Sequence, residues 1–382
     1  MTFSRFVLKN ATRNRRRTLL TVLSVGFSLL LLTVLMSVWR SFYMDAGPPA
    51  SALRLVARNR ISLTFTLPAY DWQKIAAVPG VRAITPMNWF GGVYINNQPK
   101  NFFAQFGVDP RAVFHVYPDW QIAPAQKQAF IHDRQGAAVN RKTAKKYGWK
   151  LGQRIVLRGT IYPVNLHLKL DAVFHSTGFS GLIYHQKYVA DAVSWARDND
   201  GAFYFRVGSA SDVPRVERVI GAMFHNSSHQ VKVESEKAFQ LSFVSMLGNV
   251  KAFILSICSA VVFAILLVTA NTMAMSIRER IREIAVLKTL GFEQGTILKL
   301  FVGEAVAVAL AGGILGSLLG AGLLYGIAHS PNTPMMGGSL AATPGTLVTA
   351  WAAAALIGLA SGFLPAWRAA RLNILQALRH VG

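Results

Sequence analysis

The sequence has little charge, and three long stretches have none. Only 15% of its 382 residues are Asp, Glu, Lys or Arg, whereas a soluble domain usually has about 25%. These four residue types are absent from residues 18–39, 252–277 and 305–367. A transmembrane helix needs about 20 mostly apolar residues, so each of the first two stretches fits one span. The third stretch is too long for one span and is interrupted by a segment rich in Pro and Gly, which predicts two spans.

The sequence therefore predicts an α-helical membrane protein with four transmembrane helices and a mixed α/β extracytoplasmic domain inserted between the first two. The first apolar run exceeds the h-region of a cleaved signal peptide, which has about 7–15 residues, so we expect a retained span. The predicted spans are residues 18–40, 250–277, 300–328 and 346–367. The predicted connecting segments are a basic tail (1–17), the extracytoplasmic domain (41–249), a coupling helix and loop (278–299), an external turn (329–345) and a second tail (368–382).

Basic residues near the ends of the spans predict the orientation. Lys and Arg mark the cytoplasmic loops of membrane proteins, and they are concentrated in both tails and in the coupling segment. The external turn has none. We therefore expect both termini in the cytoplasm and the large insert on the other side. Trp39 and Trp367 lie at the predicted interfaces, where aromatic belts form.

Cysteine and catalytic motifs are nearly absent as well. The single Cys258 lies in the second predicted span, so the insert has no disulfide, and the thiol is most simply a small apolar side chain. The sequence contains no Gly-x-Ser-x-Gly and no His-Glu-x-x-His. His225 and His229 occur in a loop-like segment, while Asp198 and Asp200 are typical of a turn. We expect no catalytic residue, no metal site and no cofactor bound by this chain.

The insert alternates between helix-like and strand-like patterns. Residues 71–87 predict a short helix, a turn and a strand, and residues 137–159 predict the same order. Residues 202–235 predict a strand, a helix and a second strand. The order strand–helix–strand is thus predicted near both ends of the insert, around residues 70–110 and 202–235, which is compatible with a duplicated unit without establishing one.

The formal net charge is +23, and the insert contributes much of it. Residues 45–242 hold 24 Lys and Arg against 13 Asp and Glu, a net charge of +11. This excess has two interpretations: it keeps the domain soluble, or it attracts anionic lipid headgroups or an acidic partner. We expect membrane lipid among the partners and no nucleic acid.

Small residues recur along the third predicted span. Gly312, Gly316 and Gly320 fall on one helical face, where they allow two helices to approach closely; a substrate path along this face is the alternative. Four spans are few for a closed pathway, which favours assembly with a second permease copy or a paralogue. Glu304 is the acid near the start of this span, and it fits either a carboxylate facing the helix dipole or a functional group.

A dense charged block, RERIREIAVLKTLG, separates the second and third spans. On a helical wheel Ile284 and Leu287 share an apolar arc that is flanked by a basic and an acidic stripe. Gly291 fits the left-handed residue that ends many helices. Membrane anchoring accounts for the Arg residues but not for Glu279 and Glu283, because acids contribute little to orientation. A surface that docks a partner accounts for both signs.

This block carries a family resemblance. Residues 278–323 resemble the conserved core of the MacB/FtsX-like ABC transporter permeases, in which a MacB-like periplasmic core domain precedes an FtsX-like membrane domain. That family's motif is R-x-R-E-I-[AG]-x-[LR]-[KR]-[AT]-[LI]-G, followed by an E-[AG] pair. The matching residues here are Arg280, Arg282, Glu283, Ile284, Ala285, Lys288, Thr289, Leu290, Gly291, Glu304 and Ala305. The segment LPAWRAARLNILQALRH is similar to the family's C-terminal motif, except that Asn373 and Ile374 stand where a proline is frequent.

The resemblance implies a non-catalytic subunit in a bacterial inner membrane. Such permeases act as dimers with two copies of an ABC ATPase, and the helix between spans two and three docks on the ATPase. ATP-driven closure then moves the external domain, which is called mechanotransmission. Because the sequence has no G-x-x-x-x-G-K-[ST] loop, ATP and Mg²⁺ are expected on a separate partner chain. The predicted docking residues are Arg278, Arg280, Arg282, Glu283, Ile284, Leu287, Lys288, Leu290 and Gly291.

Two functions remain open at this point. The first is export or extraction of an apolar or amphipathic substrate, in which a periplasmic adaptor is a possible further partner. The alternative is an FtsX-like regulator that activates an external protein and transports no cargo. The insert of about 200 residues matches the MacB-like branch and is large for FtsX, which favours transport. The docking motif disfavours a passive scaffold without an ATPase.

Overall fold

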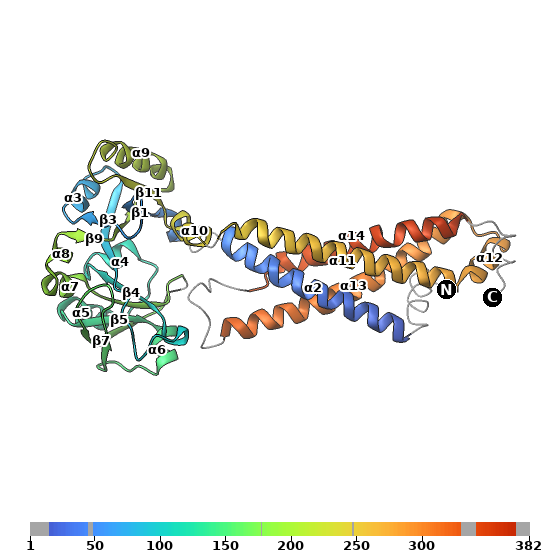
Figure 1. Ribbon diagram of the computed structural model, residues 1–382, viewed down its shortest axis with the longest axis horizontal. Helices are drawn as coiled ribbons and strands as arrows, with labels where there is room; N and C mark the ends of the chain where they lie inside the picture. Colours follow the sequence, from blue (N-terminus) through green and yellow to red (C-terminus); the bar gives the residue numbers. More distant parts are fainter. Residues whose placement is uncertain (1–14, 45–48, 177, 247, 330–340, 372–382) are drawn as a thin grey trace. The chain divides into compact units, whose positions relative to one another are not determined.

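The computed structural model describes residues 15–44, 49–176, 178–246, 248–329 and 341–371. The chain divides into two compact units, a helical unit from both ends of the sequence and an α/β unit from residues 45–248 (Figure 1). The predicted fold class, four candidate transmembrane helices with a mixed α/β domain inserted after the first, is confirmed. The N-terminal tail up to residue 14, most of the external turn and the tail from residue 372 lie outside the described residues.

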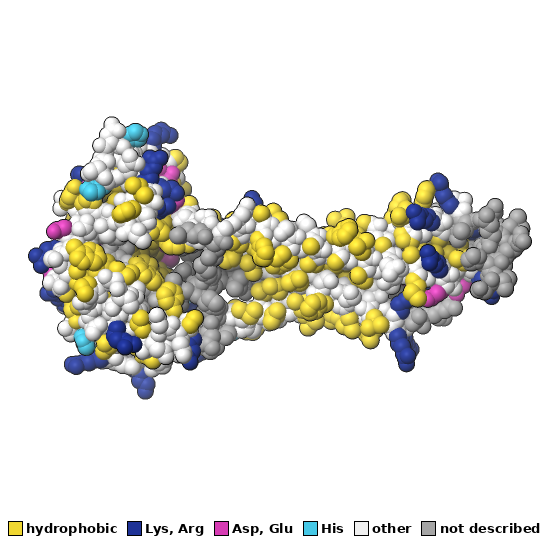
Figure 2. Space-filling model, viewed as in Figure 1, with side chains coloured by type: hydrophobic (Ala, Val, Ile, Leu, Met, Phe, Trp, Pro, Cys, Tyr) yellow, Lys and Arg dark blue, Asp and Glu magenta, His cyan; other side chains and the backbone are white. Residues whose placement is uncertain are grey.

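The helical unit contains four helices that are long and apolar enough to span a membrane. Their outward-facing side chains are largely apolar, as Phe27, Phe253 and Leu356 illustrate with more than 60% of their surface exposed. Figure 2 shows apolar side chains over much of the visible face of these helices. The helices are α2 (Arg15–Tyr43), α11 (Val250–Glu279), α13 (Gln294–His329) and α14 (Pro344–Ala370), with the short α12 (Ile281–Thr289) between α11 and α13.

Helix α13 begins at Gln294, well before residue 300, where the apolar pattern places the start of the third span. The reason is that hydropathy detects where a segment becomes apolar, whereas a helix starts where backbone hydrogen bonding starts. Polar residues such as Thr296 and Lys299 are therefore already helical.

Glycines hold α13 against α2. A Cβ on Gly316 would lie only 2.0 Å from the backbone oxygen of Gly26, and a Cβ on Gly312 would lie 3.0 Å from that of Val22. A Cβ on Gly320 would lie 3.2 Å from the Leu30 carbonyl oxygen. The three glycines of the predicted packing face thus lie at one helix contact within the chain, where the absence of side chains lets two backbones touch.

Helix α13 also packs against α14 through a second set of small residues. A Cβ on Gly313 would lie 2.7 Å from Ala354, and a Cβ on Gly362 would lie 2.6 Å from Ala305. The indole of Trp351 in α14 also donates a hydrogen bond to the Ser317 hydroxyl in α13, at 2.9 Å. Helix α13 therefore packs closely on two neighbours.

The α/β unit is built on a nine-stranded mixed sheet with the strand order β11-β1-β10-β3-β4-β8-β5-β7-β6. Its first half is antiparallel and follows the order strand–helix–strand twice, β1-α3-β3 and β10-α9-β11. This is the arrangement of ferredoxin-like folds. The sequence pattern predicted the unit at residues 202–235, but it did not identify β1, the first strand of the other unit. Its elements are β1 (Arg54–Asn59), α3 (Asp71–Ala76), β3 (Val81–Trp89), β10 (Ala202–Val207), α9 (Val213–Met223) and β11 (Val231–Ser235).

The second half is inserted between β3 and β10. Its strand pairs alternate between parallel and antiparallel, from β4–β8 to β7–β6. A separate two-stranded pair joins β2 to β9. The remaining elements are η1 (Pro49–Leu53), β2 (Leu67–Pro68), η2 (Pro99–Asn101), β4 (Ala104–Val108), α4 (Val113–Val116), α5 (Pro124–His132), β5 (Gly136–Asn140), α6 (Arg141–Tyr147), β6 (Arg154–Leu157), β7 (Leu166–Phe174), β8 (Gly181–His185), α7 (Gln186–Ala192), α8 (Ser194–Arg197), β9 (Asn199–Asp200), η3 (Ala210–Asp212) and α10 (Glu236–Met246).

Two expectations about this unit are wrong. Residues 137–140, which the sequence pattern places at the start of a helix, belong to β5, whose five residues are all buried; a short apolar run does not distinguish a buried strand from a helix. The helix α6 starts only after Asn140, whose side chain accepts the backbone N–H of Lys142. Asp200, expected in a turn, lies in β9 and is 3% exposed.

Asp200 is held by two amide groups. Its Oδ1 accepts hydrogen bonds from the Asn88 side chain at 2.7 Å and from the Gln186 side chain at 2.6 Å. Burial raises the pKa of this carboxyl to about 6, although both hydrogen bonds act in the opposite direction. The carboxylate therefore connects β9 to β3 and to the first residue of α7.

Candidate functional site

The charged block forms a short separate helix, α12, because the chain bends at both of its ends. Helix α11 ends at Glu279, and Arg280 has φ of −114° and ψ of 14°, outside helical geometry. At the other end Gly291 has φ of 88°, as the sequence predicted for the helix stop. Its N–H donates to the Lys288 carbonyl, and the Phe292 N–H donates to the Leu287 carbonyl, both at 3.1 Å. This is the paired hydrogen bonding of a Schellman ending.

One face of α12 is buried in the helical unit. Ile284 and Ala285 are both 0% exposed, and Ile284 packs with Ile277 of α11, Phe301 of α13 and Ala366 of α14. Burying an isoleucine side chain stabilises a structure by about 1.5–3 kcal/mol. Helix α12 is therefore held against three of the spanning helices.

The opposite face of α12 is open. Arg282 is exposed, and the apolar side chains of Val286 and Leu290 are 51% and 70% exposed. Phe292, directly after the helix, is 48% exposed. Large apolar side chains that stay exposed on a short helix beside basic residues are characteristic of a contact surface for another protein or a membrane. Figure 2 shows the basic side chains that gather near this end of the helical unit.

The structure separates the predicted docking residues into two groups. Arg280 and Ile284 are 6% and 0% exposed, so in this conformation they contact neighbouring helices and not a second chain. Arg278, Arg282, Leu290 and Gly291 are exposed, and Glu283, Leu287 and Lys288 are half-buried. The helical wheel separated the apolar, basic and acidic side chains of this segment. It could not tell which of them face the neighbouring helices. Sequence reasoning also missed Val286, which occupies a variable position of the motif, and Phe292, which directly follows it.

Arg280 connects α12 to α13 through a buried ion pair. Its Nη1 donates to Oε2 of Glu304 at 2.7 Å, and the two side chains are only 8% and 6% exposed. The guanidinium also lies 6.0 Å from the ring centre of Phe301 and 3.6 Å from Glu283. A pair buried this deeply is costly to break, because the partner left behind is an uncompensated charge.

The ion pair with Arg280 explains why an acidic residue, Glu304, occurs near the start of the third span. The helix-dipole interpretation is wrong, because α13 begins ten residues earlier at Gln294 and the dipole acts within the first turn. The carboxylate is instead the partner of Arg280. The family's E-[AG] pair thus has a packing role at both positions in this chain: Glu304 pairs with Arg280, and Ala305 packs against α14.

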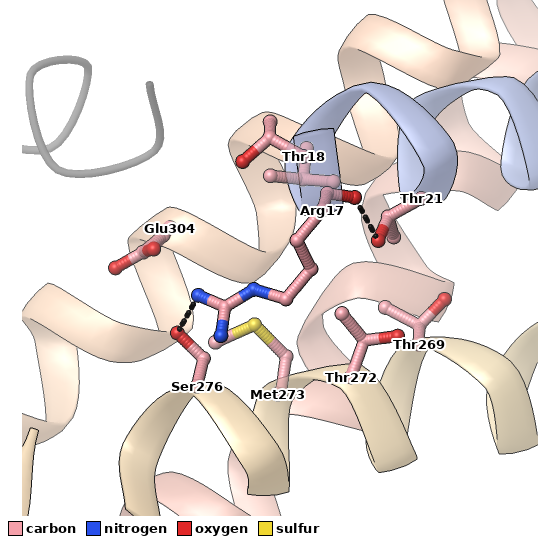
Figure 3. A pocket seen from close by; sticks show the side chains of 9 residues that line it. Arg17, Thr18, Thr21, Thr269, Thr272, Met273, Ser276 and Glu304 are labelled. Carbon is pink, nitrogen blue, oxygen red and sulfur yellow. Dashed lines mark hydrogen bonds between the residues drawn. The ribbon is translucent and has the colours of Figure 1, made fainter. Parts of the chain in front are cut away.

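A second polar contact joins α2 to the end of α11. Arg17 forms an ion pair with Glu279, and its Nη2 donates to the Ser276 hydroxyl at 2.9 Å. Figure 3 shows the Arg17 side chain reaching from α2 across a small pocket toward Ser276, with Glu304 nearby. The pocket is lined by three helices: Arg17, Thr18 and Thr21 of α2, Thr269, Thr272, Met273 and Ser276 of α11, and Glu304 and Val308 of α13.

The α/β unit has its own buried ion network, at the places where the chain enters and leaves the unit. Arg54 begins β1, and its guanidinium bonds to Glu236 at 2.5 Å and to Asp119 at 2.6 Å. The Tyr117 hydroxyl donates to the same Glu236 carboxylate at 3.0 Å. Also on β1, Arg58 pairs with Glu234 at 2.7 Å.

This network ties the two connections of the α/β unit together. Arg54 follows the segment that comes from α2, and Glu236 begins α10, which precedes α11 in the chain. Burial acts to lower the pKa of Arg54, but Glu236, Tyr117 and Asp119 together outweigh burial, so the pKa is raised above its usual value. Burial, reinforced by Glu236, also raises the pKa of Tyr117 well above its usual value. Arg54 therefore stays charged and Tyr117 stays a hydrogen-bond donor.

Two protein families match the chain. The family model of the MacB-like periplasmic core domain matches residues 18–223, more than half of the chain, and that of the FtsX-like permease C-terminal domain matches residues 253–374. The chain belongs to the MacB/FtsX-like ABC transporter permeases. The first match covers α2 and most of the α/β unit, and the second covers α11 to α14 with α12 between them.

Relatives of this permease differ in length. An uncharacterized ABC transporter permease of Methanocaldococcus jannaschii is 25% identical over an alignment of 402 residues. The alignment covers 98% of this chain and 96% of that one. The macrolide export ATP-binding/permease protein MacB of Bdellovibrio bacteriovorus is 31% identical over 183 residues, 46% of this chain. The matched part is 27% of that longer relative.

Two solved structures are also similar to the permease. One is the periplasmic region of MacB from Actinobacillus actinomycetemcomitans, with 10% identity and a TM-score of 0.37, covering 50% of this chain and 92% of that one. The other is the extracellular domain of the ABC-type transporter YknZ from Gram-positive bacteria, with 13% identity and a TM-score of 0.35, covering 47% and 99%.

Proposed function

We propose that this chain is the non-catalytic permease subunit of an ABC transporter complex in a bacterial inner membrane. In this proposal a separate ATPase, present in two copies, binds ATP and Mg²⁺ and docks on α12 in the cytoplasm. Two permease copies, or this chain and a paralogue, complete the complex. ATP hydrolysis moves the α/β unit on the other side of the membrane and thereby exports or extracts an apolar or amphipathic substrate.

The observation that carries the proposal is the two-sided character of α12. Its inner face is fixed by Ile284 and by the Arg280–Glu304 pair, so a displacement of α12 acts directly on α13. Its outer face exposes Arg282, Val286 and Leu290, a combination that membrane anchoring alone does not require. A helix that is rigidly attached inside and apolar outside fits the transmission of a partner's motion into the spans.

Two further contacts support transmission along the chain. Arg17 attaches α2 to α11 beside α12, so these two helices share one end of the helical unit. In the α/β unit, Arg54 and Glu236 attach the two chain connections to each other. Because both connections lead to spanning helices, a relative movement of α2 and α11 reaches the α/β unit at this ion pair.

To test whether the ATPase docks on α12, a double variant of α12 is compared with a double variant of α2. Arg282→Glu combined with Leu290→Glu changes only exposed side chains at α12. We expect a tagged double variant, purified in mild detergent from its own host, to lose vanadate-sensitive ATP hydrolysis that co-purifies with the unmodified chain. Arg15→Glu with Arg16→Glu is the control, since both side chains are exposed on α2 before the predicted span begins, and it should keep that activity.

Two results would contradict the proposal. One is a purified unmodified chain without any ATP-hydrolysing subunit. The other is a double variant on α12 that retains full ATP hydrolysis while the control on α2 loses it, which would place the docking surface elsewhere. Substrate export is tested separately, by accumulation of an apolar or amphipathic compound in cells that lack the chain.

A further inference from the structure

The basic charge of the α/β unit is concentrated in two stretches, and the function proposed above does not use it. Between Asp133 and Asp171 the chain has nine Lys and Arg residues and no acid, and between Asp71 and Asp109 it has three and no acid. Among the described residues, the ion pairs formed within these stretches involve Lys74, Arg134 and Lys169. The other basic side chains in them have no carboxylate within 4.0 Å in the described structure.

The two stretches meet in space at the loop between β3 and β4. Val93 of that loop pairs with Arg158 in an antiparallel bridge, and Nη2 of Arg158 donates to the Ile95 carbonyl at 2.9 Å. The Tyr147 hydroxyl, at the end of α6, donates to the Lys100 carbonyl at 3.3 Å. Helix α6 adds the exposed Lys142 and Lys145 and contains no acid. The loop, the turn after β6 and α6 are therefore neighbours, and together they carry the exposed Lys100, Lys142, Lys145 and Arg158.

Apolar side chains stand exposed within this basic surface. Ile95, Phe102 and Ile161 are 63%, 54% and 53% exposed. The rings of Phe102 and Trp89 are 5.8 Å apart. Trp89 and Ile161 are neighbours as well, because a Cβ on Gly91 would lie 2.8 Å from both side chains. The exposed apolar groups thus come from the same loop and turn that carry Lys100 and Arg158.

Ile95 is also held in a backbone conformation that its side chain disfavours. Its φ is 62°, in the left-handed region, where a β-branched residue is a genuine outlier. Glycine or asparagine would relieve this strain. The side chain is 63% exposed, so packing inside the unit does not explain its retention. Residues kept in strained geometry are concentrated where a ligand or partner is bound.

We propose that this basic loop surface binds the surface of an anionic phospholipid bilayer. The apolar side chains insert between the headgroups, while the lysines around them contact the phosphates, which is how interfacial segments bind anionic membranes. An acidic protein is the other class of partner that such a surface could attract, and the experiment below distinguishes it from lipid. The surface consists of Ile95, Lys100, Phe102, Lys142, Lys145, Arg158 and Ile161.

The single native cysteine makes a direct test feasible. In a Cys258→Ser background, Ile95→Cys provides one labelling site for an environment-sensitive NBD fluorophore on the full chain. The labelled chain is reconstituted into vesicles of phosphatidylcholine alone, or of phosphatidylcholine and phosphatidylglycerol in equal amounts. We expect blue-shifted emission, quenched by lipids with a nitroxide on the acyl chain, only in the anionic vesicles. High salt should reverse the shift, because it screens exposed charges.

Charge reversal provides the matched controls. Lys100→Glu, Lys142→Glu and Lys145→Glu together should abolish the emission shift. Arg111→Glu, Lys187→Glu and Arg218→Glu reverse the same number of charges outside the surface and should leave the shift intact. Identical emission in the two lipid compositions would overturn the proposal, as would a shift that survives the triple variant within the surface. If the triple variant instead loses an acidic protein that co-purifies with the chain and the lipid signal is absent throughout, the surface is a protein contact and the proposal is wrong.

Discussion

The helical unit and the α/β unit fill their interiors in different ways. In the helical unit the closest contacts are made by residues with almost no side chain, such as Gly26 against Gly316 and Ala305 against Gly362. In the α/β unit the interior is rich in large aromatic side chains, such as Phe90, Phe174 and Phe203, all 0% exposed. Lipid tails are as apolar as Leu, so burying Leu gives little drive to helix association, and close packing replaces it. In water, burial of large apolar surface is the main stabilising contribution.

The two units are nevertheless alike in one respect: each contains a deeply buried Arg–Glu pair. Arg280 pairs with Glu304 in the helical unit, and Arg54 pairs with Glu236 in the α/β unit. Each pair joins two elements that are separate along the chain. Such pairs contribute little net stability relative to an apolar replacement, but breaking one is strongly destabilising. The difference in packing predicts different sensitivities to side-chain size, and the shared ion pairs predict a common sensitivity to charge.

The largest expected effect comes from adding a side chain at the α2–α13 contact. Gly316→Leu places a large group where even a Cβ would lie 2.0 Å from the Gly26 carbonyl oxygen, so the two helices must separate. We expect the purified variant to lose its monodisperse peak in size-exclusion chromatography in mild detergent and to become sensitive to trypsin.

The same helix supplies the control for this change. A Cβ on Gly322 would meet open space, since within the described residues no heavy atom beyond its own helix and chain neighbours lies within 4 Å of that position. Gly322→Leu should therefore leave assembly and trypsin resistance unchanged. Equal behaviour of the two variants would show that the small-residue contact does not determine packing in the helical unit.

A smaller effect is expected from breaking the ion network of the α/β unit. Arg54→Met leaves Glu236 buried without its cation, which costs about 3–5 kcal/mol. We expect hydrogen exchange to accelerate in peptides from β1 and α10, measured by mass spectrometry on the full chain. Lys232→Met removes a cation whose side chain is 45% exposed, from its pair with Glu234. Because exposed pairs contribute about 0–1 kcal/mol, hydrogen exchange in this control should match that of the unmodified chain. Comparable acceleration of hydrogen exchange in both variants would contradict the role assigned to burial of the ion pair.

The sequence predicted the architecture well where the pattern was long and the physical rule simple. Charge-free stretches identified the four spans, and the pattern of residues 202–235 identified the strand, helix and strand of β10-α9-β11. Gly291 was recognisable as a helix ending because left-handed geometry favours one residue type. These are local signals, and each has one main structural interpretation.

Contacts between distant residues could not be predicted in the same way. The pairing of Arg280 with Glu304 depends on how α12 folds back onto α13, and no local pattern encodes that angle. For the same reason the motif suggested Ile284 as a docking residue although it is fully buried. Asp200 resembled a turn residue because its partners, Asn88 and Gln186, are far away in the sequence. Pairings of this kind depend on the completed packing of each unit.

The smallest predicted effect is a pH dependence that is specific to the α/β unit. Burial raises the pKa of Asp200 from 3.8 to about 6, so the folded state holds the proton more tightly than the unfolded chain. The corresponding stability is fully present below pH 3.8 and is lost as the pH rises to about 6.

Asp200→Asn keeps an oxygen that accepts the hydrogen bonds from Asn88 and Gln186 and removes the charge. At pH 7 this variant should be more stable by about 1–3 kcal/mol, with a flatter dependence of the thermal unfolding midpoint on pH. Asp198→Asn, at an exposed neighbour, should follow the unmodified chain; if it flattens the profile equally, burial of Asp200 is not the cause.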